Sequence, residues 1–335
     1  MFDESLPRKI RVSIGSAVIL GLTKGLLDAK PTTIYLLTYK MGKCSASCAF
    51  CPQSKKSDAR SDMLSRVVWP IFQTEDVIRR IAEAFEKEKI KRVCIQALNY
   101  PMVQNDIICL AEKVRSVSQV PISVSCQPLN REDISRLYQV GVNRVSIALD
   151  AVTEEIFSKT KGVLIGGPYT WERHFEALKE AVNIFGRGCV TTHLIVGLGE
   201  KEEDFVRMIQ RCVDLGVYPA VFAFTPIPGT SMANHHQPSL SSYRRIQLAH
   251  YLMTNGIKHY KDMRFNDDRL IDFGLPPKEL RKIIRTGEPF KTSGCPGCNR
   301  PYYNERPGGP IYNYPRKPTS KEISEIEKQT IHISR

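Results

Sequence analysis

Three cysteines stand close together in the segment KCSASCAFCPQ, at positions 43–53. Cys44, Cys48 and Cys51 have the spacing C-x3-C-x2-C, and the chain has no fourth cysteine close behind them. Structural zinc sites and iron–sulfur clusters usually take four protein ligands. A set of three thiolates therefore predicts a metal centre that leaves one coordination position open to another ligand.

A second cysteine pair lies near the other end of the chain. Cys295 and Cys298 form a CxxC in the Gly- and Pro-rich stretch SGCPGCNRPYYNERPGGP. Such a knuckle is common in zinc and iron–sulfur ligation. A redox dithiol is less favoured, because the pair does not open a helix. The pair on its own is compatible with a peripheral zinc site or with a cluster that other cysteines complete.

Apolar, β-rich segments alternate with segments of helical periodicity through most of the chain. We expect strands at 32–39, 91–98, 121–126, 144–150, 189–197 and 220–227, and helices between them. This alternation is typical of βαβ units and a parallel sheet. The strands are almost continuously apolar, which indicates coverage on both faces or a barrel interior. Six units predict an α/β fold with a partial (β/α)6 TIM-like barrel.

The expected sheet gathers the chemistry-bearing residues at one rim. In parallel α/β folds, functional groups collect at the C-terminal ends of the strands. The three-cysteine loop follows the first strand, Cys94 lies in the second, and Cys126 and Asp150 close the third and fourth. We therefore expect a single site at this edge.

The remaining chain divides into two extensions. We expect 1–29 to form an N-terminal helical extension around the apolar run from Val12 to Leu22, and 30–260 to form the barrel. Residues 261–335 would form an irregular extension whose CxxC completes the active site. No segment approaches the ~20 apolar residues that span a bilayer, and the start of the chain lacks a signal-peptide cleavage site. These features predict a cytoplasmic protein without a membrane partner.

The chain is strongly basic. Its 48 Lys and Arg residues exceed its 35 Asp and Glu residues, and the formal net charge is +13. Such an excess favours an acidic partner. No run of five or more basic residues occurs, so nucleic acid is not the favoured partner.

The C-x3-C-x2-C spacing, with Phe50 before the last cysteine, resembles the signature of the radical S-adenosylmethionine (SAM) superfamily. This resemblance implies that Cys44, Cys48 and Cys51 hold a 4Fe–4S cluster whose open iron binds SAM. Reduction of the cluster would then release methionine and a 5′-deoxyadenosyl radical. Phe50 would contribute to the cofactor site.

Two later segments extend this resemblance. HLIVGLGE is similar to the superfamily's GxIxGxxE segment, with Ile195, Gly197 and Glu200 in place and His193 at the first glycine. FTPIPGT, at 224–230, is similar to the sixth-strand segment of the biotin synthase branch. The common GGE motif is replaced by CIQALNYP, and biotin synthases also lack it. The resemblance implies that both segments contact the adenine of SAM.

The resemblance to biotin synthases covers most of 30–265. It implies that Asp150 binds the ribose of SAM, although Ala148 stands where that family has a polar residue. It also implies that Arg173, in WERHFEALKEA, binds the SAM carboxylate.

The same family holds a second, sulfur-donating cluster on its barrel strands. Cys94 and Cys126 fall at matching strand positions, whereas Cys189 is two residues out of register with the third cysteine. With Cys295 and Cys298 the two strand cysteines make four thiolates. The resemblance therefore implies an auxiliary 4Fe–4S cluster in the barrel mouth.

The tail on such a barrel resembles the two-protein lipoyl synthases of archaea and some bacteria. This implies sulfur insertion at C6 or C8 of an octanoyl chain on an acidic lipoyl-carrier protein, with the auxiliary cluster as sulfur donor. It also implies a homologous radical SAM partner protein and an electron donor such as ferredoxin. Arg300, Arg306 and Arg316 would help to dock the carrier.

Two other functions stay open. One is another biotin synthase-like radical SAM enzyme that acts on a small molecule. The other is a non-catalytic zinc-binding or nucleic-acid-binding protein. The missing third barrel cysteine and the added CxxC argue against biotin synthase itself, and we expect Cys109 and Cys212 to lie in the core.

Overall fold

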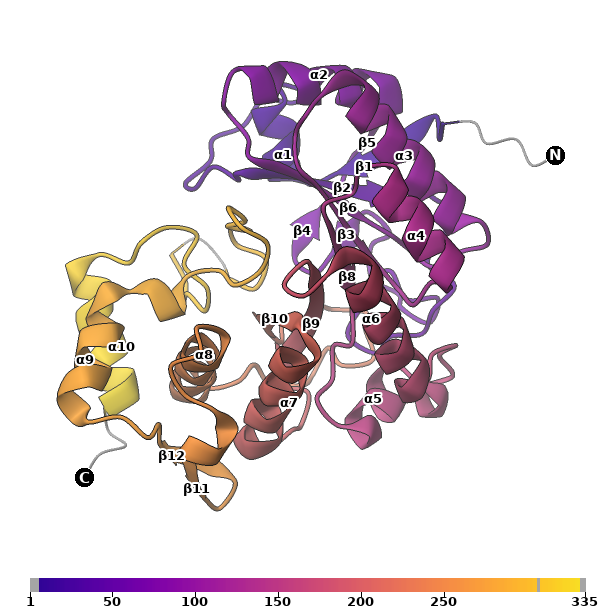
Figure 1. Ribbon diagram of the computed structural model, residues 1–335. Coiled ribbons are helices and arrows are strands. Elements are labelled where there is room, and N and C mark those ends of the chain that lie inside the picture. The colour runs from indigo at the N-terminus through magenta and orange to yellow at the C-terminus, as the bar shows by residue number, and fades with distance from the viewer. Residues whose placement is uncertain (1–5, 306–307, 332–335) are drawn as a thin grey trace.

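A curved sheet with helices on its outer face organises the computed structural model, which describes residues 6–305 and 308–331 (Figure 1). Within these residues eight strands form one sheet, in the order β10-β9-β8-β7-β6-β2-β1-β5. Its parallel strands are β2 (Thr33–Thr38), β6 (Arg92–Gln96), β7 (Ile122–Cys126), β8 (Arg144–Ile147), β9 (Val190–Val196) and β10 (Val217–Ala223). The predicted α/β fold with a partial barrel of six units is confirmed, although β10 begins and ends earlier than expected.

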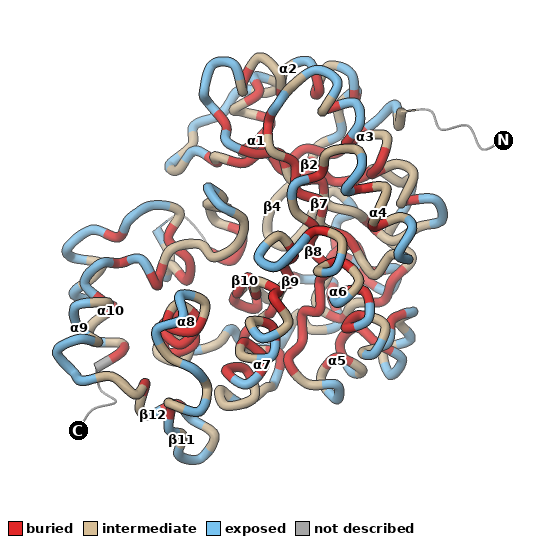
Figure 2. The backbone as a smooth tube through the Cα atoms, viewed as in Figure 1, coloured by how far each residue is buried: buried red, intermediate tan, exposed pale blue. Residues whose placement is uncertain are grey.

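Helices follow the parallel strands and pack on the outside of the barrel. They are α2 (Thr74–Glu86), α3 (Val103–Val117), α4 (Arg131–Gln139), α5 (Glu154–Thr160), α6 (Trp171–Phe185), α7 (Glu202–Leu215) and α8 (Leu240–Thr254). In α2 the buried residues Val77, Ile78 and Ile81 recur at helical spacing, so one stripe faces the sheet. Asn130 caps α4, since its side chain accepts a hydrogen bond from Asp133 N. The strands between these helices are largely buried (Figure 2).

The N-terminal part contributes strands as well as a helix. β1 (Lys9–Val12) pairs antiparallel with β2 and with β5 (Ile71–Gln73), and α1 (Ile14–Ile19) follows β1. A two-stranded ribbon, β3 (Met63–Leu64) and β4 (Val67–Val68), precedes β5. The expectation of a helical extension is wrong for β1, because four residues are too few to display a strand periodicity.

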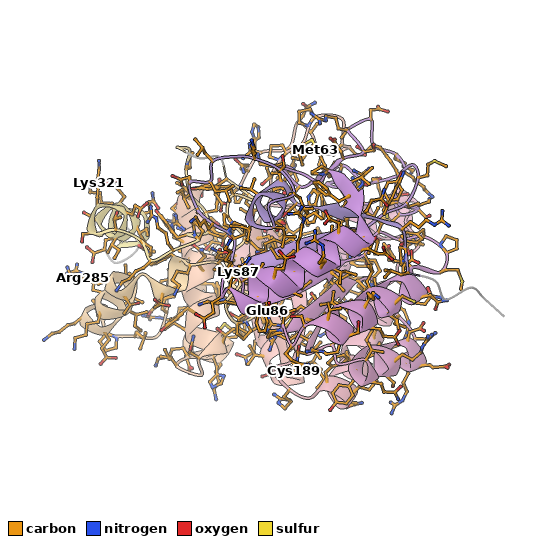
Figure 3. All side chains as sticks on the ribbon, turned by 90° about the horizontal axis from the view of Figure 1, so that it is seen from above. Met63, Glu86, Lys87, Cys189, Arg285 and Lys321 are labelled. Carbon is orange, nitrogen blue, oxygen red and sulfur yellow. The ribbon has the colours of Figure 1, made fainter. Side chains whose placement is uncertain are left out.

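The C-terminal part contains more regular structure than the sequence predicts. It comprises β11 (Arg264–Asn266), β12 (Arg269–Asp272), α9 (Pro277–Thr286) and α10 (Ser320–Ile331). Its chain lies beside α8 and β10 (Figure 1). Arg285 of α9 and Lys321 of α10 lie together on one side of the molecule, apart from Glu86 at the end of α2 (Figure 3).

The segment between α9 and α10, here called the tail (described residues 291–305 and 308–319), is fixed to the barrel by polar contacts. Ser293 Oγ accepts a hydrogen bond from the amide of Val221 at the free edge of β10, at 2.8 Å. The buried Arg244 of α8 donates to the carbonyls of Ile311 and Tyr312. The tail therefore covers the edge that the open barrel leaves unpaired.

Among the described residues, no helix combines the length and the apolar character needed to cross a membrane.

Candidate functional site

A cavity of about 260 Å³ lies inside the partial barrel, and all six parallel strands contribute to its wall. Its lining includes seven cysteines: Cys44, Cys48, Cys51, Cys94, Cys126, Cys295 and Cys298. Several buried side-chain atoms on the lining residues have no hydrogen-bond partner, namely Gln127 Oε1, Arg144 Nε, Ser146 Oγ, Tyr169 Oη and Tyr303 Oη. Because buried polar groups in native proteins are nearly always hydrogen-bonded, these atoms indicate that the cavity takes a ligand.

The three-cysteine loop closes one end of the cavity, beyond the C-terminal ends of β2 and β6. Cys44 N donates to Gln53 O at 3.0 Å and Ser45 N donates to Asn99 O at 2.7 Å. Asn99 N in turn donates to Cys44 Sγ at 3.1 Å. These bonds fix the loop to the residues that follow β6 and hold its thiols at the cavity.

Burial dominates the electrostatics of the Cys48 and Cys51 thiols. It raises the pKa of Cys51 to about 12, and the charge of Cys44 acts in the same direction. It also raises the pKa of Cys48, where Lys161 opposes the rise and the neighbouring cysteines add to it. Neutral thiols are therefore favoured without a metal, and the positive charge of bound iron would be needed to hold them as thiolates.

The donor set fits an iron–sulfur cluster better than a single ion. Among the described residues, no three His, Cys, Asp or Glu side chains lie close enough together to hold one metal ion. A 4Fe–4S cluster is larger than one ion, so its thiolates stand further apart. Three thiols facing a cavity, with none completing the set, fit a cluster that keeps one iron open.

Cys94, Cys295 and Cys298 lie at the other end of the cavity. Thr32, just before β2, donates through its amide to Asn299 Oδ1 at 3.0 Å, and Asn299 Nδ2 donates to Lys30 O at 2.9 Å. These contacts dock the CxxC at the N-terminal ends of the strands, which differs from the expected place in the barrel mouth. The barrel thus presents a cysteine set at each end.

These three thiols are close enough to influence one another. Burial raises the pKa of Cys94 well above its usual value, and the charges of Cys295 and Cys298 raise it further. Burial also raises the pKa of Cys298, while Arg300 opposes the rise. The structure therefore brings Cys94 together with the tail pair, as the sequence predicts.

Cys126 does not join this set, although it borders the cavity. Side chains alternate along a strand, and Cys126 has the same parity in β7 as the fully buried Ile122 and Val124. Its partner in β8 is Ile147, and its Sγ lies 3.8 Å from the carbonyl of Ser146. Cys94 pairs with Ser123, so Cys126 lies on the opposite face of the sheet from Cys94. This corrects the predicted grouping of four cysteines, because the structure brings together only Cys94 and the tail pair. The alternation in PISVSC carried this information.

The predicted SAM-contacting residues divide into two groups. Phe50 and Ile195 line the cavity. Gly197 and Glu200 instead shape the turn after β9, where the Glu200 carboxylate accepts hydrogen bonds from Gly197 N at 2.7 Å and Leu198 N at 2.8 Å. A side chain at Gly197, whose φ is +102°, would place its Cβ 2.8 Å from Pro238.

Asp150 lines the cavity beside the three-cysteine loop, and its carboxylate has a partner that the sequence did not reveal. Lys161 Nζ lies 2.6 Å from Asp150 Oδ2, and the Lys161 side chain is 0% exposed. The ammonium also donates to the carbonyl of Ala148. A lysine just after an amphipathic helix reads as a solvent-exposed residue, so no sequence signal identified this buried pair.

Arg173 does not line the cavity. Its guanidinium donates to Leu129 O and lies 3.5 Å from Glu176 and 3.6 Å from Glu180. The Arg173 guanidinium, which the resemblance assigns to the SAM carboxylate, is instead engaged by these two carboxylates and the carbonyl.

The tail arginines also differ from the expectation of a docking surface. Arg300 is inside the cavity, with its guanidinium carbon 3.7 Å from the centre of the Phe222 ring and a bond to Ser293 O. Arg316 is exposed and paired with Glu322 at 2.8 Å. Arg306 lies outside the described residues.

His193 is a further cavity residue, and its position in HLIVGLGE marks it in the sequence. Its ring centre lies 4.9 Å from that of Phe222. Burial lowers the pKa of His193 to about 4, so the imidazole is neutral at physiological pH.

Comparison with known proteins gives a consistent result. Residues 38–212 match the family model of the radical SAM superfamily. The chain is 26% identical over 205 residues to the biotin synthase of Sulfurihydrogenibium sp. (strain YO3AOP1), covering 60% of this chain and 57% of that protein. It is 27% identical over 205 residues to the biotin synthase of Aquifex aeolicus (strain VF5), covering 59% and 57%. The matched region thus spans a little over half the length of these curated relatives.

Two solved structures support the fold alone. Methylornithine synthase (PylB) superimposes with a TM-score of 0.52 at 13% identity, covering 68% of this chain and 64% of that chain. The [FeFe]-hydrogenase maturase HydG gives a TM-score of 0.52 at 15% identity, covering 68% and 51%.

Proposed function

The chain belongs to the radical SAM superfamily, and from that premise we propose that it is a sulfur-insertion enzyme. One observation carries the proposal: two separate cysteine sets face a single cavity from its opposite ends. The curated relatives that this chain matches are biotin synthases, named for a product that contains sulfur. Membership of a superfamily of enzymes argues against the non-catalytic zinc-binding alternative.

The end of the cavity at the three-cysteine loop, here called the upper end, is the proposed cofactor site. Cys44, Cys48 and Cys51 would hold a 4Fe–4S cluster with one iron free for SAM. The chemistry that this group supplies when bound is one-electron cleavage of SAM, which gives a radical able to take hydrogen from an unactivated C–H bond. Phe50 and Ile195 supply apolar surface for the adenine in this proposal.

Asp150 is the proposed ribose partner. Its carboxylate borders the cavity and is fixed by the buried ammonium of Lys161. A carboxylate that accepts one hydrogen bond from lysine retains acceptor sites for a pair of hydroxyl groups. Lys161 would therefore orient Asp150 rather than occupy it fully.

The opposite end of the cavity, here called the lower end, is the proposed site of a sulfur-donating cluster. Cys94, Cys295 and Cys298 would hold an auxiliary 4Fe–4S cluster with three thiolates rather than four. The tail covers the free edge of β10 next to this site. A covered wall keeps water and free thiols away from a carbon radical.

We propose an octanoyl chain on a lipoyl-carrier protein as the substrate, thiolated at C6 or C8. The formal charge of +13 supports an acidic carrier as partner, and Leu37, Leu98 and Ala220 give the cavity apolar surface for an alkyl chain. A homologous radical SAM protein and a reductant such as ferredoxin complete the proposed set of partners.

A row of polar side chains in the cavity wall favours a second substrate class, a small molecule with hydrogen-bonding groups. Gln96, Ser125, Ser146 and Thr191 are lateral neighbours on β6 to β9 and all line the cavity. Ser146 Oγ has no partner. This polar row suits a small molecule with hydrogen-bonding groups, as another biotin synthase-like enzyme would bind.

A single assay separates the two substrates. The protein is reconstituted with iron and sulfide and incubated anaerobically with SAM, a reductant and an octanoyl-lysine peptide, in parallel with the sulfur-free precursor of biotin. A mass gain of one sulfur atom on the peptide supports lipoyl synthesis, and a gain on the precursor supports the second class. Formation of 5′-deoxyadenosine without either product would contradict sulfur insertion into these substrates.

A further inference from the structure

The lower end of the cavity contains two hydroxyl groups that the sulfur-insertion scheme does not use. Tyr35 on β2 pairs in register with Cys94 on β6, and Cys94 pairs with Ser123 on β7. Paired residues of neighbouring strands project from the same face. The hydroxyls of Tyr35 and Ser123 therefore stand on either side of Cys94, facing the tail cysteines.

The Tyr35 hydroxyl has a defined hydrogen-bond direction. The amide of Arg300 donates to Tyr35 Oη at 3.0 Å, and an amide N–H can only donate. Tyr35 Oη also lies 3.1 Å from Cys298 Sγ. Because its lone pair takes the amide proton, its own proton is available for Cys298 Sγ. A metal-bound thiolate has no proton, so in a loaded site only the hydroxyl can donate.

The Ser123 hydroxyl repeats this arrangement at the other tail cysteine. Arg92 donates through its guanidinium to Ser123 Oγ at 2.9 Å, and a guanidinium has no acceptor. Ser123 Oγ lies 3.3 Å from Cys295 Sγ. Both residues are buried, with Tyr35 2% and Ser123 3% exposed. Each tail sulfur therefore meets one wall hydroxyl that already accepts a hydrogen bond from elsewhere.

We infer that Tyr35 and Ser123 are positioning residues of the auxiliary site. Each donates a hydrogen bond to the sulfur of one tail cysteine, and together they favour the reduced state of a cluster held by Cys94, Cys295 and Cys298. The inference rests on the proposed function, which supplies the cluster. Hydrogen bonds to ligand sulfurs are among the factors that set the potential of iron–sulfur clusters, because they stabilise the extra negative charge of the reduced form.

The three-cysteine loop gives an internal reference, because it lies at the opposite end of the cavity. The reconstituted protein and its Tyr35→Phe, Ser123→Ala and double variants are titrated with dithionite, and each cluster is followed by its own EPR signal. Tyr260→Phe is the matched control, since its hydroxyl contacts Glu203 and Arg207 on α7 and does not line the cavity. Iron content and circular dichroism establish that each variant is folded and loaded.

We expect the midpoint potential of the auxiliary cluster to fall in each single variant and to fall further in the double variant. The potential of the SAM-type cluster should not change, and Tyr260→Phe should leave both potentials unchanged. Loaded variants whose auxiliary potential equals that of the wild type would overturn this inference and leave the proposed function standing. A wild-type protein that binds only one cluster would overturn the proposed function and this inference with it.

Discussion

The two cysteine sets are built in opposite ways. Cys44, Cys48 and Cys51 lie within eight consecutive residues, and backbone hydrogen bonds fix their loop to the chain just after β6. The other set joins Cys94, in the middle of a strand, to the pair Cys295 and Cys298. The first cysteine of that pair follows Cys94 by 201 residues. The first set is largely a property of one short segment. The second exists only when the tail docks.

This difference has a thermodynamic consequence. Holding the ligands of a short loop costs little conformational entropy. Docking a distant segment costs more conformational entropy, which contacts made elsewhere must offset. Those contacts include the buried network around Arg244 and the bond from Val221 to Ser293. Changes far from the cavity should therefore weaken the auxiliary site and leave the loop intact.

The largest effect is expected from Cys48→Ala, which removes a ligand from the three-cysteine loop. SAM cleavage should fall to background, because a cluster with two thiolates is not held stably. Formation of 5′-deoxyadenosine, measured by chromatography, checks this. Cys189→Ala is the control, since Cys189 lies just before β9 and does not line the cavity. A Cys48→Ala protein that still cleaves SAM would remove the loop from the cofactor site.

A Cys94→Ala variant removes a ligand from the second cysteine set only, and Cys126→Ala is its matched control. Cys94→Ala should lose about four iron per chain and all sulfur insertion, yet retain SAM cleavage. Cys126→Ala should retain both clusters and lose only about 1 kcal/mol of stability through its small buried cavity. Iron analysis and thermal unfolding measure these outcomes. Loss of auxiliary iron in Cys126→Ala would restore the four-thiolate set.

Arg244→Leu tests whether tail docking supports the auxiliary site. The substitution leaves the Ile311 carbonyl without its Arg244 donor, while the Tyr312 carbonyl keeps only the hydrogen bond from Gln247 Nε2. The expected cost is about 1–3 kcal/mol. The auxiliary EPR signal should decrease more than the SAM-type signal, and the midpoint of thermal unfolding should fall. Arg264→Leu, at a side chain that is 78% exposed, should have neither effect. Equal loss of both signals would contradict the proposed difference.

The smallest effect concerns the end of the tail. A hydrogen bond from Arg316 lowers the pKa of Glu322 to about 2, from an ordinary value of 4.5. This pair therefore stabilises the fold fully above about pH 4.5 and loses that contribution as the pH falls toward 2. Glu322→Gln should cost about 0.5–1 kcal/mol, with the same difference from about pH 6 to about pH 8.

Urea unfolding at several pH values in this range measures the effect. Glu325→Gln on the same helix removes an exposed pairing with Lys328 and serves as the control. A Glu322→Gln difference that grows or vanishes within the range would mean that another group controls the docking of α10.

Much of the barrel was predictable because its signals are local. The six parallel strands are short apolar runs between helices of regular periodicity, and the C-x3-C-x2-C loop needs no distant partner. The placement of Phe50 and Ile195 follows from these same segments. The boundaries of the three predicted parts of the chain stay a prediction.

The sequence-based predictions are wrong where contacts between distant parts of the chain determine the structure. β1 is only four residues long and gains its partners from β2 and β5. The tail enters from the N-terminal ends of the strands, and no sequence rule indicates the end at which a distant segment docks. Cys126 is a different case, because the alternation of Ser123, Ser125 and the apolar residues between them already assigns it to the outer face.

The most direct test of two separate sites is the metal content of the anaerobically reconstituted wild-type protein, with Mössbauer spectra to identify the clusters. Two 4Fe–4S clusters predict about eight iron and about eight sulfide per chain, falling to about four of each in Cys94→Ala with the SAM-type spectrum unchanged. About four iron in the wild type, or zinc in place of iron at the tail cysteines, would contradict the account.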